Sequence, residues 1–310
     1  MNKKILIALI ATTLIVPATS QAALKSEVVT QVPTVAILDT ALDNKLPMFQ
    51  GRIAYEVCIL EWASCPNGKS FMEGTDSALL PYSIISKNGF EHGTEMTSIL
   101  LQNNPSVKVV FVRIVGATST GVRQITNEVT FYNALDWVYK NKDRFNIQAV
   151  AMSQSHHNLM PSIDYCPTTP ITQSKIKDLV TAGIPVFLPT GNDTDYSRIS
   201  WPACINESIS IGASDKYNEI APYSNYDPLK TDFFTLGNAN AYLPGSEPTA
   251  IAGTSVSVQM AAAQWMTLKL AKPALTYDQL YSLLVLTSKV TKNSKISSNR
   301  LINLKAALNG

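Results

Sequence analysis

The chain has 310 residues, of which 45% are hydrophobic and 15% are charged. This is ordinary globular composition, and the length suffices for one large domain or two small ones. The formal net charge is only +2, and the sequence shows no basic patch with interleaved aromatic residues, so we expect no nucleic-acid partner.

The first residues have the pattern of an export signal. Lys3 and Lys4 precede an apolar run from Ile5 to Val16, and Ser20-Gln21-Ala22 offers a small-x-small cleavage site. The run is too short to cross a bilayer, and no later stretch is long and apolar enough to be a membrane helix. We therefore expect residues 1–22 to be a signal peptide of an exported protein, secreted or periplasmic, without a membrane anchor. The remaining chain carries 23 basic and 23 acidic residues.

Strand-like and helix-like segments then alternate along the chain. The predicted strands are short, rich in Val and Ile and apolar on both faces, as in a buried parallel sheet; they are Val35–Asp39, Val107–Val115, Ile147–Met152, Ile184–Pro189 and Ser208–Ala213. Apolar residues at helical spacing predict helices over Gly93–Gln102, Thr126–Tyr139 and Gln173–Ala182. This alternation predicts an α/β fold, a doubly wound domain with a mostly parallel central sheet and helices on both faces.

The C-terminal part adds two predicted helices. A helix rich in small residues follows Ser255 and stops near Pro273, and a final helix over Thr276–Ser288 begins with a threonine cap. The segment Tyr55–Ser83 is the least regular part and is interpreted as an insertion. We expect three parts: the signal peptide 1–22, a short N-terminal segment 23–34 and a single domain over 35–310.

The chain contains four cysteines: Cys58, Cys65, Cys166 and Cys204. Export makes disulfides plausible, and four cysteines permit three pairings that sequence alone does not separate. We favour Cys58–Cys65, which would close a short loop, together with Cys166–Cys204. A metal site is the rival interpretation, but the spacing is not CxxC and the chain has only three histidines.

Three short segments supply an aspartate, a histidine and a serine in that order. They are Val35-Ala36-Ile37-Leu38-Asp39-Thr40, Glu91-His92-Gly93-Thr94 and Gly253-Thr254-Ser255-Val256-Ser257. Asp39 ends a predicted buried strand, where it can accept a hydrogen bond from an imidazole and select its tautomer. His92 is the candidate base at a helix N-terminus, and Ser255 is the candidate nucleophile at the start of another helix. We expect the three to meet at one hydrogen-bonded point on the rim of the sheet.

Each segment alone has a simpler structural explanation. Asp39 can cap a turn, Ser255 can cap a helix, and a lone histidine is more often structural. Three such segments in order are hard to obtain by chance, and Pro189-Thr190-Gly191-Asn192 supports them, because an asparagine at a strand end can donate to an oxyanion. Ser257 stands where a Gly-x-Ser-x-Gly motif needs its second glycine, which disfavours an α/β-hydrolase.

In this order the segments resemble those of the subtilases, the subtilisin-like serine endopeptidases. The resemblance runs from Val35 to Ala271 and implies a subtilisin-like fold. It implies that Asp39 orients the base, that His92 acts as general base and then acid, and that Ser255 forms an acyl-enzyme. Asn192 and the backbone N–H of Ser255 would then stabilise the oxyanion.

The resemblance also implies where an extended substrate lies. One segment lies near residues 119–121 and the other near residues 153–155, and a peptide would add as a β-strand between them. The candidate substrate-binding residues are Ser119, Thr120, Gly121, Ser153, Gln154, Ser155, Thr190 and Gly191. The expected partner is a protein or peptide substrate, and the expected assembly is a monomer.

We expect no required cofactor and identify no metal ligands. Calcium sites are frequent among subtilases, and Asp43 lies where a family carboxylate commonly sits, but no full ligand set is recognisable. The chain departs from the family pattern after the nucleophile, where Val256-Ser257-Val258 follows and the usual proline is missing. Ser155 stands where family members often have glycine, and residues 23–34 are too few for a folded propeptide domain.

Two alternatives stay open at this point. An exported binding protein on a decayed subtilase scaffold would explain the altered segment after Ser255, although every catalytic position is present. A relative with a Ser-Glu-Asp triad, such as a sedolisin, would use a carboxylate base at acid pH. His92 argues against that relative, and Glu95 is the only local carboxylate that could take its place.

Overall fold

The computed structural model describes residues 32–118, 123, 127–155, 166, 168–293 and 299–310. Residues Gln31–Gly310 group into one compact unit. The predicted signal peptide 1–22 and the segment 23–31 therefore lie outside the described residues, as do Ser119, Thr120 and Gly121.

Within the described residues, the main sheet has ten strands. They are β1 (Thr34–Asp39), β2 (Ile53–Ile59), β3 (Phe71–Glu73), β4 (Lys108–Arg113), β5 (Ile147–Met152), β6 (Val186–Pro189), β7 (Ile209–Ser214), β8 (Phe233–Leu236), β11 (Lys289–Val290) and β12 (Arg300–Leu301). Their spatial order is β11-β12-β8-β7-β6-β5-β1-β4-β2-β3. The outermost pairs, β2 with β3 and β11 with β12, are antiparallel, and the inner pairs are parallel. The predicted mostly parallel sheet is confirmed.

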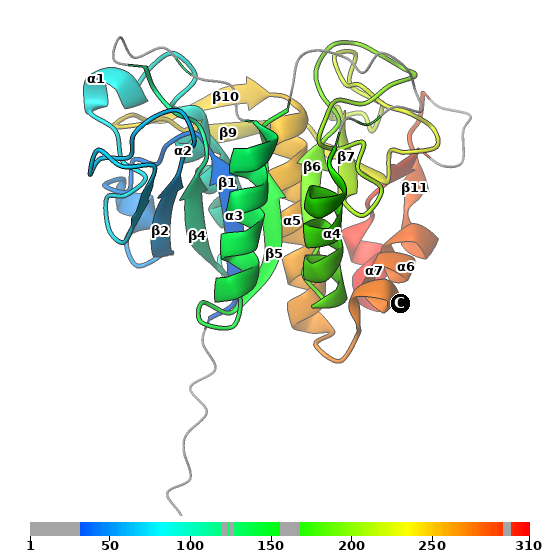
Figure 1. Cartoon of the computed structure of the whole chain (residues 1–310). Helices are drawn as coiled ribbons and strands as arrows, with labels where there is room; N and C mark the ends of the chain where they lie inside the picture. Colours follow the sequence, from blue (N-terminus) through cyan, green and yellow to red (C-terminus); the bar gives the residue numbers. More distant parts are fainter. Residues whose placement is uncertain (1–31, 119–122, 124–126, 156–165, 167, 294–298) are drawn as a thin grey trace, which may run out of the picture. The chain divides into compact units, whose positions relative to one another are not determined.

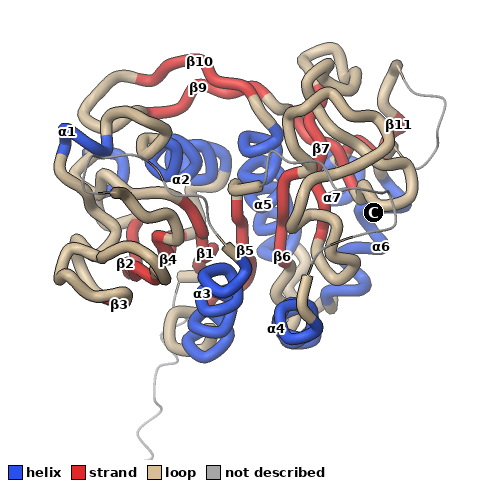
Figure 2. Tube along the Cα trace, turned by 45° about the horizontal axis from the view of Figure 1, so that its top comes forward, coloured by secondary structure: helices blue, strands red, loops and turns tan. Residues whose placement is uncertain are grey.

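Helices cover both faces of this sheet. The face drawn toward the viewer in Figure 1 carries α3 (Glu128–Asn141) and α4 (Pro170–Thr181). The opposite face carries α2 (His92–Asn103), α5 (Thr254–Ala271), α6 (Tyr277–Thr287) and α7 (Leu304–Asn309), and Figure 2 shows α2 and α5 on the other side of β1 and β5 from α3. A short helix α1 (Tyr82–Ile85), a 3₁₀ turn (Pro47–Phe49) and a separate hairpin of β9 (Asn238–Tyr242) and β10 (Pro248–Ala252) complete the described elements.

The central strand β1 is buried along its whole length. Its side chains alternate between the two layers: Ala36 and Leu38 pack into the core under α3 and α4, whereas Val35 and Ile37 pack into the core under α5. A strand that is covered on both faces has no solvent side, which explains why its sequence is apolar throughout. Burial on both faces holds the carboxyl end of β1, and hence Asp39, in one place.

The helix starts follow local sequence signals. Asn127 caps α3 by accepting a hydrogen bond from the backbone N–H of Thr130 at 2.8 Å. Thr276 and Gln279 form a reciprocal capping box at the start of α6, so the predicted threonine cap is confirmed. Helix α5 is buried against the sheet through small residues such as Ala261 and Ala262, which allow a close approach.

Three sequence interpretations need correction. The segment Tyr55–Ser83 is not simply an irregular insertion, because β2 pairs in parallel with β4 and β3 extends the sheet edge. The continuous apolar pattern of a buried strand is missing at the start of β2, because its first residues are partly exposed. The helix over Thr276–Ser288 is not the last, since α7 follows it. The strands β8–β12 went unpredicted because they are short or half exposed, with little periodicity to read.

The four cysteines form two disulfides, Cys58–Cys65 and Cys166–Cys204, in the pairing that the sequence favoured. The first closes the loop after β2, and the second joins the segment before α4 to the one before β7. No cysteine is left unpaired among the described residues.

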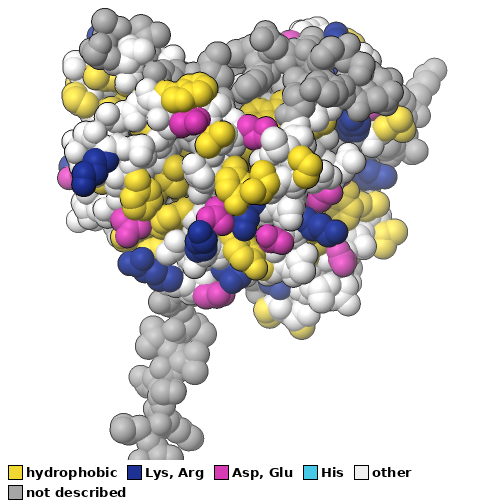
Figure 3. Space-filling view, in the orientation of Figure 1, with side chains coloured by type: hydrophobic (Ala, Val, Ile, Leu, Met, Phe, Trp, Pro, Cys, Tyr) yellow, Lys and Arg dark blue, Asp and Glu magenta, His cyan; other side chains and the backbone are white. Residues whose placement is uncertain are grey.

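The face that bears α3 and α4 carries interspersed basic and acidic side chains (Figure 3). Asp136 on α3 pairs with Lys140 at 2.6 Å and with Lys175 on α4 at 3.1 Å, so the two helices are joined at their outer surface. Among the residues described, none of the helices combines the length and apolar character that a membrane crossing needs.

Candidate active site

Polar side chains gather at the carboxyl ends of three strands that are neighbours in the sheet. Asp39 ends β1, Ser153 and Gln154 directly follow β5, and Asn192 lies three residues beyond β6. The register pairs Leu38 with Met152, so Asp39 and Ser153 come next to each other at the rim. Open α/β sheets place ligands and catalytic groups at this edge.

Asp39 is fully buried and its Oδ1 atom is held from three sides. The backbone N–H of Thr40 donates to it at 2.7 Å, and the His92 Nδ1 atom lies 2.8 Å away. The Gln154 Nε2 atom donates to the same oxygen at 2.7 Å. The Oδ2 atom has no hydrogen-bond partner among the described residues. A carboxylate so placed can hold an imidazole with its Nδ1–H pointing inward and Nε2 free.

His92 is the first residue of α2, where the prediction located it. The helix can approach β1 closely because Gly93 has no side chain: a Cβ there would overlap the carbonyl oxygen of Ala41 and lie 2.7 Å from the Phe111 ring. The backbone N–H of Gly93 also donates to Thr40 Oγ1 at 2.9 Å. Glycine at position 93 thus brings the imidazole to Asp39.

The electrostatic surroundings favour the protonated form of the His92 ring. Burial alone would lower the pKa of His92, but the charge of Asp39 and its hydrogen bond outweigh that effect, and Glu95 adds to them. The guanidinium of Arg123 acts in the opposite direction. The net result is that the pKa of His92 is raised above its ordinary value.

Ser255 is the second residue of α5, and its hydroxyl is bonded to Ser153, directly after β5, and not to His92. Ser255 Oγ donates to the carbonyl oxygen of Ser153 at 3.1 Å, and Ser153 Oγ donates to the carbonyl oxygen of Ser255 at 3.0 Å. The expectation that all three residues share one hydrogen-bonded point is therefore only half met: Asp39 and His92 are bonded, whereas no hydrogen bond joins His92 and Ser255 among the described residues. Catalytic hydrogen bonds are often long or misaligned before substrate binds, and a rotation about the Ser255 side chain redirects its Oγ.

The helices that carry His92 and Ser255 are in contact near these residues. Met96, one turn after His92, and Val256, next to Ser255, belong to the same small core cluster. The first turn of a helix also presents backbone N–H groups without carbonyl partners, together with the positive end of the helix dipole. The start of α5 is therefore a favourable place for a developing negative charge.

Asn192 reaches the start of α5 from the end of β6. The turn that joins β6 to Asn192 needs glycine at position 191. Gly191 has a φ of +107°, and a Cβ there would collide with the side chains of Ser200 and Asn225. Asn192 Oδ1 accepts hydrogen bonds from the backbone N–H of Thr254 at 2.9 Å and from Thr254 Oγ1 at 3.0 Å. With its oxygen so occupied, the amide presents its Nδ2 hydrogens as donors beside Gly253.

The remaining predicted substrate residues are placed as follows. Ser153 is buried and bonded to Ser255, Ser155 is partly exposed, and Thr190 is buried with its hydroxyl donating to the carbonyl oxygen of Asn225 at 2.6 Å. The Gln154 side chain turns inward to Asp39.

Sequence reasoning missed three residues of this network. Thr40 holds Asp39 through its N–H, Arg123 donates to Gln154 Oε1, and Gln259 Nε2 donates to Ser153 Oγ at 2.9 Å. Gln259 occupies the position where the family pattern has proline, which was the available signal. Nothing in the sequence around Arg123 indicates its partner.

Asp43, the carboxylate considered as a calcium ligand, is hydrogen-bonded to two loop segments. Both carboxylate oxygens of Asp43 are engaged by backbone N–H groups, Oδ1 by Lys45 at 3.2 Å and Oδ2 by Gly245 at 3.0 Å. The described residues contain no cluster of three or more His, Cys, Asp or Glu side chains that could hold a metal. Asp43 thus joins the backbone at Lys45 to the backbone at Gly245.

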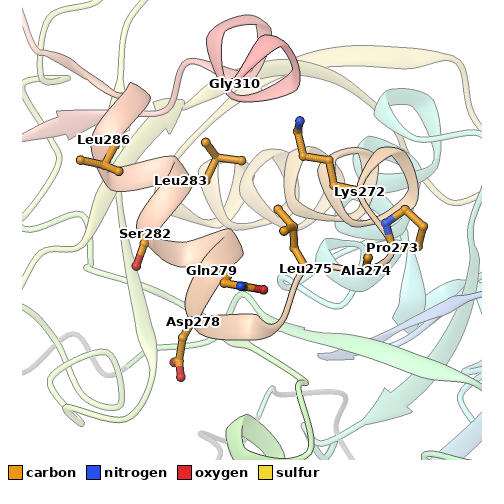
Figure 4. A pocket seen from close by; sticks show the side chains of 10 residues that line it. All are labelled: Lys272, Pro273, Ala274, Leu275, Asp278, Gln279, Ser282, Leu283, Leu286 and Gly310. Atoms are coloured by element: carbon orange, nitrogen blue, oxygen red, sulfur yellow. The ribbon is translucent and has the colours of Figure 1, made fainter.

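The residues that line a hollow at the opposite end of α5 include no histidine (Figure 4). The hollow is lined by aliphatic side chains of the α5–α6 connection and α6, such as Leu275 and Leu283, together with the polar side chains of Lys272, Asp278 and Ser282. Because α5 runs from Thr254 to Ala271, this hollow lies about 25 Å along the helix from Ser255. The rim at Asp39, His92 and Ser255 is thus the candidate active site.

Comparisons with known proteins agree with this geometry. The model of the Subtilase family matches residues 30–302. M-protease of Shouchella clausii is 24% identical over 250 residues, which cover 77% of this chain and 58% of that protein. Subtilisin BL of Lederbergia lenta is 24% identical over 250 residues, covering 77% of this chain and 82% of that protein. The chain thus spans less than two thirds of the length of M-protease and most of the length of Subtilisin BL.

Solved structures show the same fold at low sequence identity. A mutant of the protease domain of PatA superposes with a TM-score of 0.69 at 15% identity, covering 89% of this chain and 94% of that one. A protease of Pseudoalteromonas arctica gives a TM-score of 0.69 at 18% identity, with 90% of each chain covered.

Proposed function

The chain belongs to the subtilase family of serine endopeptidases, and we propose that it hydrolyses peptide bonds through an acyl-enzyme formed on Ser255. The observation that carries this proposal is the 2.8 Å contact between His92 Nδ1 and the buried Asp39, next to the helix start that bears Ser255. Asp39 then orients the imidazole with its Nε2 toward the nucleophile.

The reaction begins with a turn of the Ser255 side chain. Its Oγ leaves the carbonyl oxygen of Ser153, passes its proton to His92 Nε2 and bonds to the carbonyl carbon of the scissile peptide. The carbonyl oxygen becomes an oxyanion, to which Asn192 Nδ2 and the backbone N–H of Ser255 donate. His92 then gives the proton to the leaving amine, the C–N bond breaks, and a water molecule that His92 deprotonates hydrolyses the ester.

The substrate in this proposal is an extended protein or peptide segment. It pairs its main chain with the segment after β5, near Ser153–Ser155, in the manner of an added strand. We prefer this function to the alternative of a binding protein without activity, because His92 is bonded to Asp39 and Asn192 reaches the start of the helix that bears Ser255.

We further propose that the protein is exported. The support is the charged and apolar leader of residues 1–22 together with two disulfides, which persist in oxidising compartments. The mass of the N-terminal peptide of protein recovered from culture medium or periplasm checks the expected start after Ala22.

A fluorophosphonate probe tests the nucleophile directly. The wild-type protein should become labelled and Ser255→Ala should not. Ser257→Ala is the matched control, because Ser257 is on the same helix but donates to the carbonyl oxygen of Thr235, away from His92. Labelling of Ser255→Ala at the wild-type rate would end the proposal.

A further inference from the structure

Gln154 is a buried polar side chain in an unusual place. Only 5% of its surface is exposed, although glutamine is mostly found on protein surfaces. A buried amide needs hydrogen-bond partners at both ends, and the partners of Gln154 are ionisable residues of the site itself. The residue directly follows β5, next to Ser153.

Both ends of the Gln154 amide are occupied. Nε2 donates to Asp39 Oδ1 at 2.7 Å and lies 3.1 Å from His92 Nδ1, and Oε1 accepts from Arg123 Nη2. A guanidinium can only donate, so Arg123 requires the amide oxygen to face it. The NH₂ group is thereby directed at Asp39 and His92, and a flipped amide would set oxygen against the carboxylate.

Gln154 and His92 use the same carboxylate oxygen. Together with the Thr40 N–H, they place three donors within 2.8 Å of Asp39 Oδ1, whereas Oδ2 takes no hydrogen bond among the described residues. A donor that shares an acceptor weakens the other bonds to it. The amide hydrogens of Gln154 also bring positive partial charge to the Nδ1 side of the ring.

We propose that Gln154 is a positioning residue that shares Asp39 with His92 and thereby weakens the hold of the carboxylate on the imidazolium. Arg123 keeps the amide in the orientation that does this. The inference rests on the proposed role of His92 as the base, since the protonation of that ring decides whether Ser255 can be activated. By lowering the proton affinity of the ring, Gln154 keeps His92 available as a base at lower pH.

Charged groups near the His92 ring also affect its protonation, and the effect of Gln154 adds to theirs. Asp39 and Glu95 favour the imidazolium, and Arg123 disfavours it. The charge of Glu91, which precedes His92, attracts the guanidinium of Arg123 and favours its charged form. Gln154 carries no charge, so its effect depends on the position of its NH₂ group. A methionine of similar length removes that group together with the amide oxygen that Arg123 bonds, which is why Arg123 is tested separately.

The test is an NMR titration of the His92 ring in protein labelled with ¹³C-histidine. The Ser255→Ala background prevents self-cleavage, and His92→Ala identifies the signal among those of the three histidines. With Gln154→Met the pKa of His92 should rise by about 0.5–1 unit. Gln148→Met, the same substitution at a partly exposed residue on β5 whose amide donates to Asn146, should leave that pKa unchanged.

Gln154→Glu is the second variant, should the methionine protein not fold. It adds a negative charge, so it is read only against Gln154→Leu, which removes the NH₂ donor without adding charge; in Gln154→Leu the pKa of His92 should rise as in Gln154→Met. An unchanged pKa in whichever of the uncharged variants, Gln154→Met or Gln154→Leu, folds as judged by circular dichroism overturns the inference.

Arg123 is tested by a double-mutant cycle on the same pKa. If Arg123 acts partly through Gln154, Arg123→Met should raise the pKa of His92 less in the Gln154→Met background than in the wild type. Equal effects would remove Arg123 from the inference. Because the titration needs no turnover, it can fail while peptidase activity is present, and it can succeed in a protein without activity, which would refute the proposed function alone.

Discussion

Ser153 and Ser255 hold each other through two reciprocal hydrogen bonds, at 3.0 and 3.1 Å, across the junction of β5 and α5. Gln259, one helical turn after Ser255, donates to Ser153 Oγ at 2.9 Å. The nucleophile is thus fastened to the strand segment along which we propose the substrate binds, and this fastening must open when the Ser255 hydroxyl turns to His92.

Removing the Ser153 hydroxyl should lower stability because it leaves the buried amide of Gln259 without a hydrogen-bond acceptor. In Ser153→Ala the Gln259 amide loses its partner, and we expect the free energy of unfolding to fall by about 1–3 kcal/mol. The double variant Ser153→Ala with Gln259→Leu leaves no donor unpaired and should recover part of that loss. Urea denaturation of the four proteins measures the coupling, and additive losses would show that the Gln259 contact has no energetic weight.

Replacing the Asp39 carboxylate should disable the base while leaving the fold intact. In Asp39→Asn the amide no longer selects the His92 tautomer with a free Nε2, and kcat should fall on the order of 10⁴-fold. The assay is steady-state hydrolysis of casein or a chromogenic peptide. A loss of less than tenfold would contradict the role given to Asp39.

The pH dependence of activity follows from the protonation of His92. Because the pKa of the ring is raised above 6.5 in the folded protein, kcat/KM should fall on acidification with a limb above that value. An optimum near pH 3–4 would instead indicate a carboxylate base, for which Glu95 is the nearby candidate.

The same shift predicts how stability varies with pH. A group whose pKa is raised by folding adds stability that is fully present below its unfolded pKa and is lost as pH rises through its folded pKa. The wild type should therefore exceed His92→Gln in unfolding free energy most strongly below pH 6.5, and the difference should shrink at higher pH. A difference that grows with pH would reverse the assigned sign.

The Asn192 side chain has two roles: its oxygen accepts hydrogen bonds from Thr254, and its NH₂ group is the proposed oxyanion donor. Two substitutions separate these roles. Asn192→Ala loses both the bond to the Thr254 N–H and the oxyanion donor, so it should lose about 0.5–1.5 kcal/mol of stability and about 10²–10³-fold in kcat. Asn192→Asp keeps an acceptor for Thr254, loses the donor and adds a negative charge beside the proposed oxyanion. It should retain stability better than the alanine variant and lose at least as much activity, and an active aspartate variant would rule out the oxyanion role.

The two disulfides should differ in their contribution to stability. The loop closed by Cys166–Cys204 spans 38 residues and that closed by Cys58–Cys65 spans 7. On the chain-entropy model, the paired alanine substitutions should cost about 4 and about 2 kcal/mol, respectively. Thermal unfolding of the two double variants checks the order, and the reverse order would indicate that strain or residual structure dominates.

Much of the architecture follows from local patterns. The inner strands are apolar on both faces because both are covered, and so Val35–Asp39 and Ile147–Met152 were recognised almost to the residue. The strands at the sheet margins escaped because partial exposure mixes polar residues into them, as in β2 and β9. The hydrophobic pattern therefore identified the fully buried strands and failed for the short, partly exposed ones.

By itself, the sequence determined the family, the sheet type and the order of Asp39, His92 and Ser255, because each of these is written in contiguous residues. Only the tertiary structure decided what those residues touch: that the Ser255 hydroxyl is bonded to Ser153, and that Gln154 turns inward to share Asp39. Such contacts depend on which strand ends become neighbours and how each side chain rotates there. That information lies in the packing of distant segments, and no local pattern carries it.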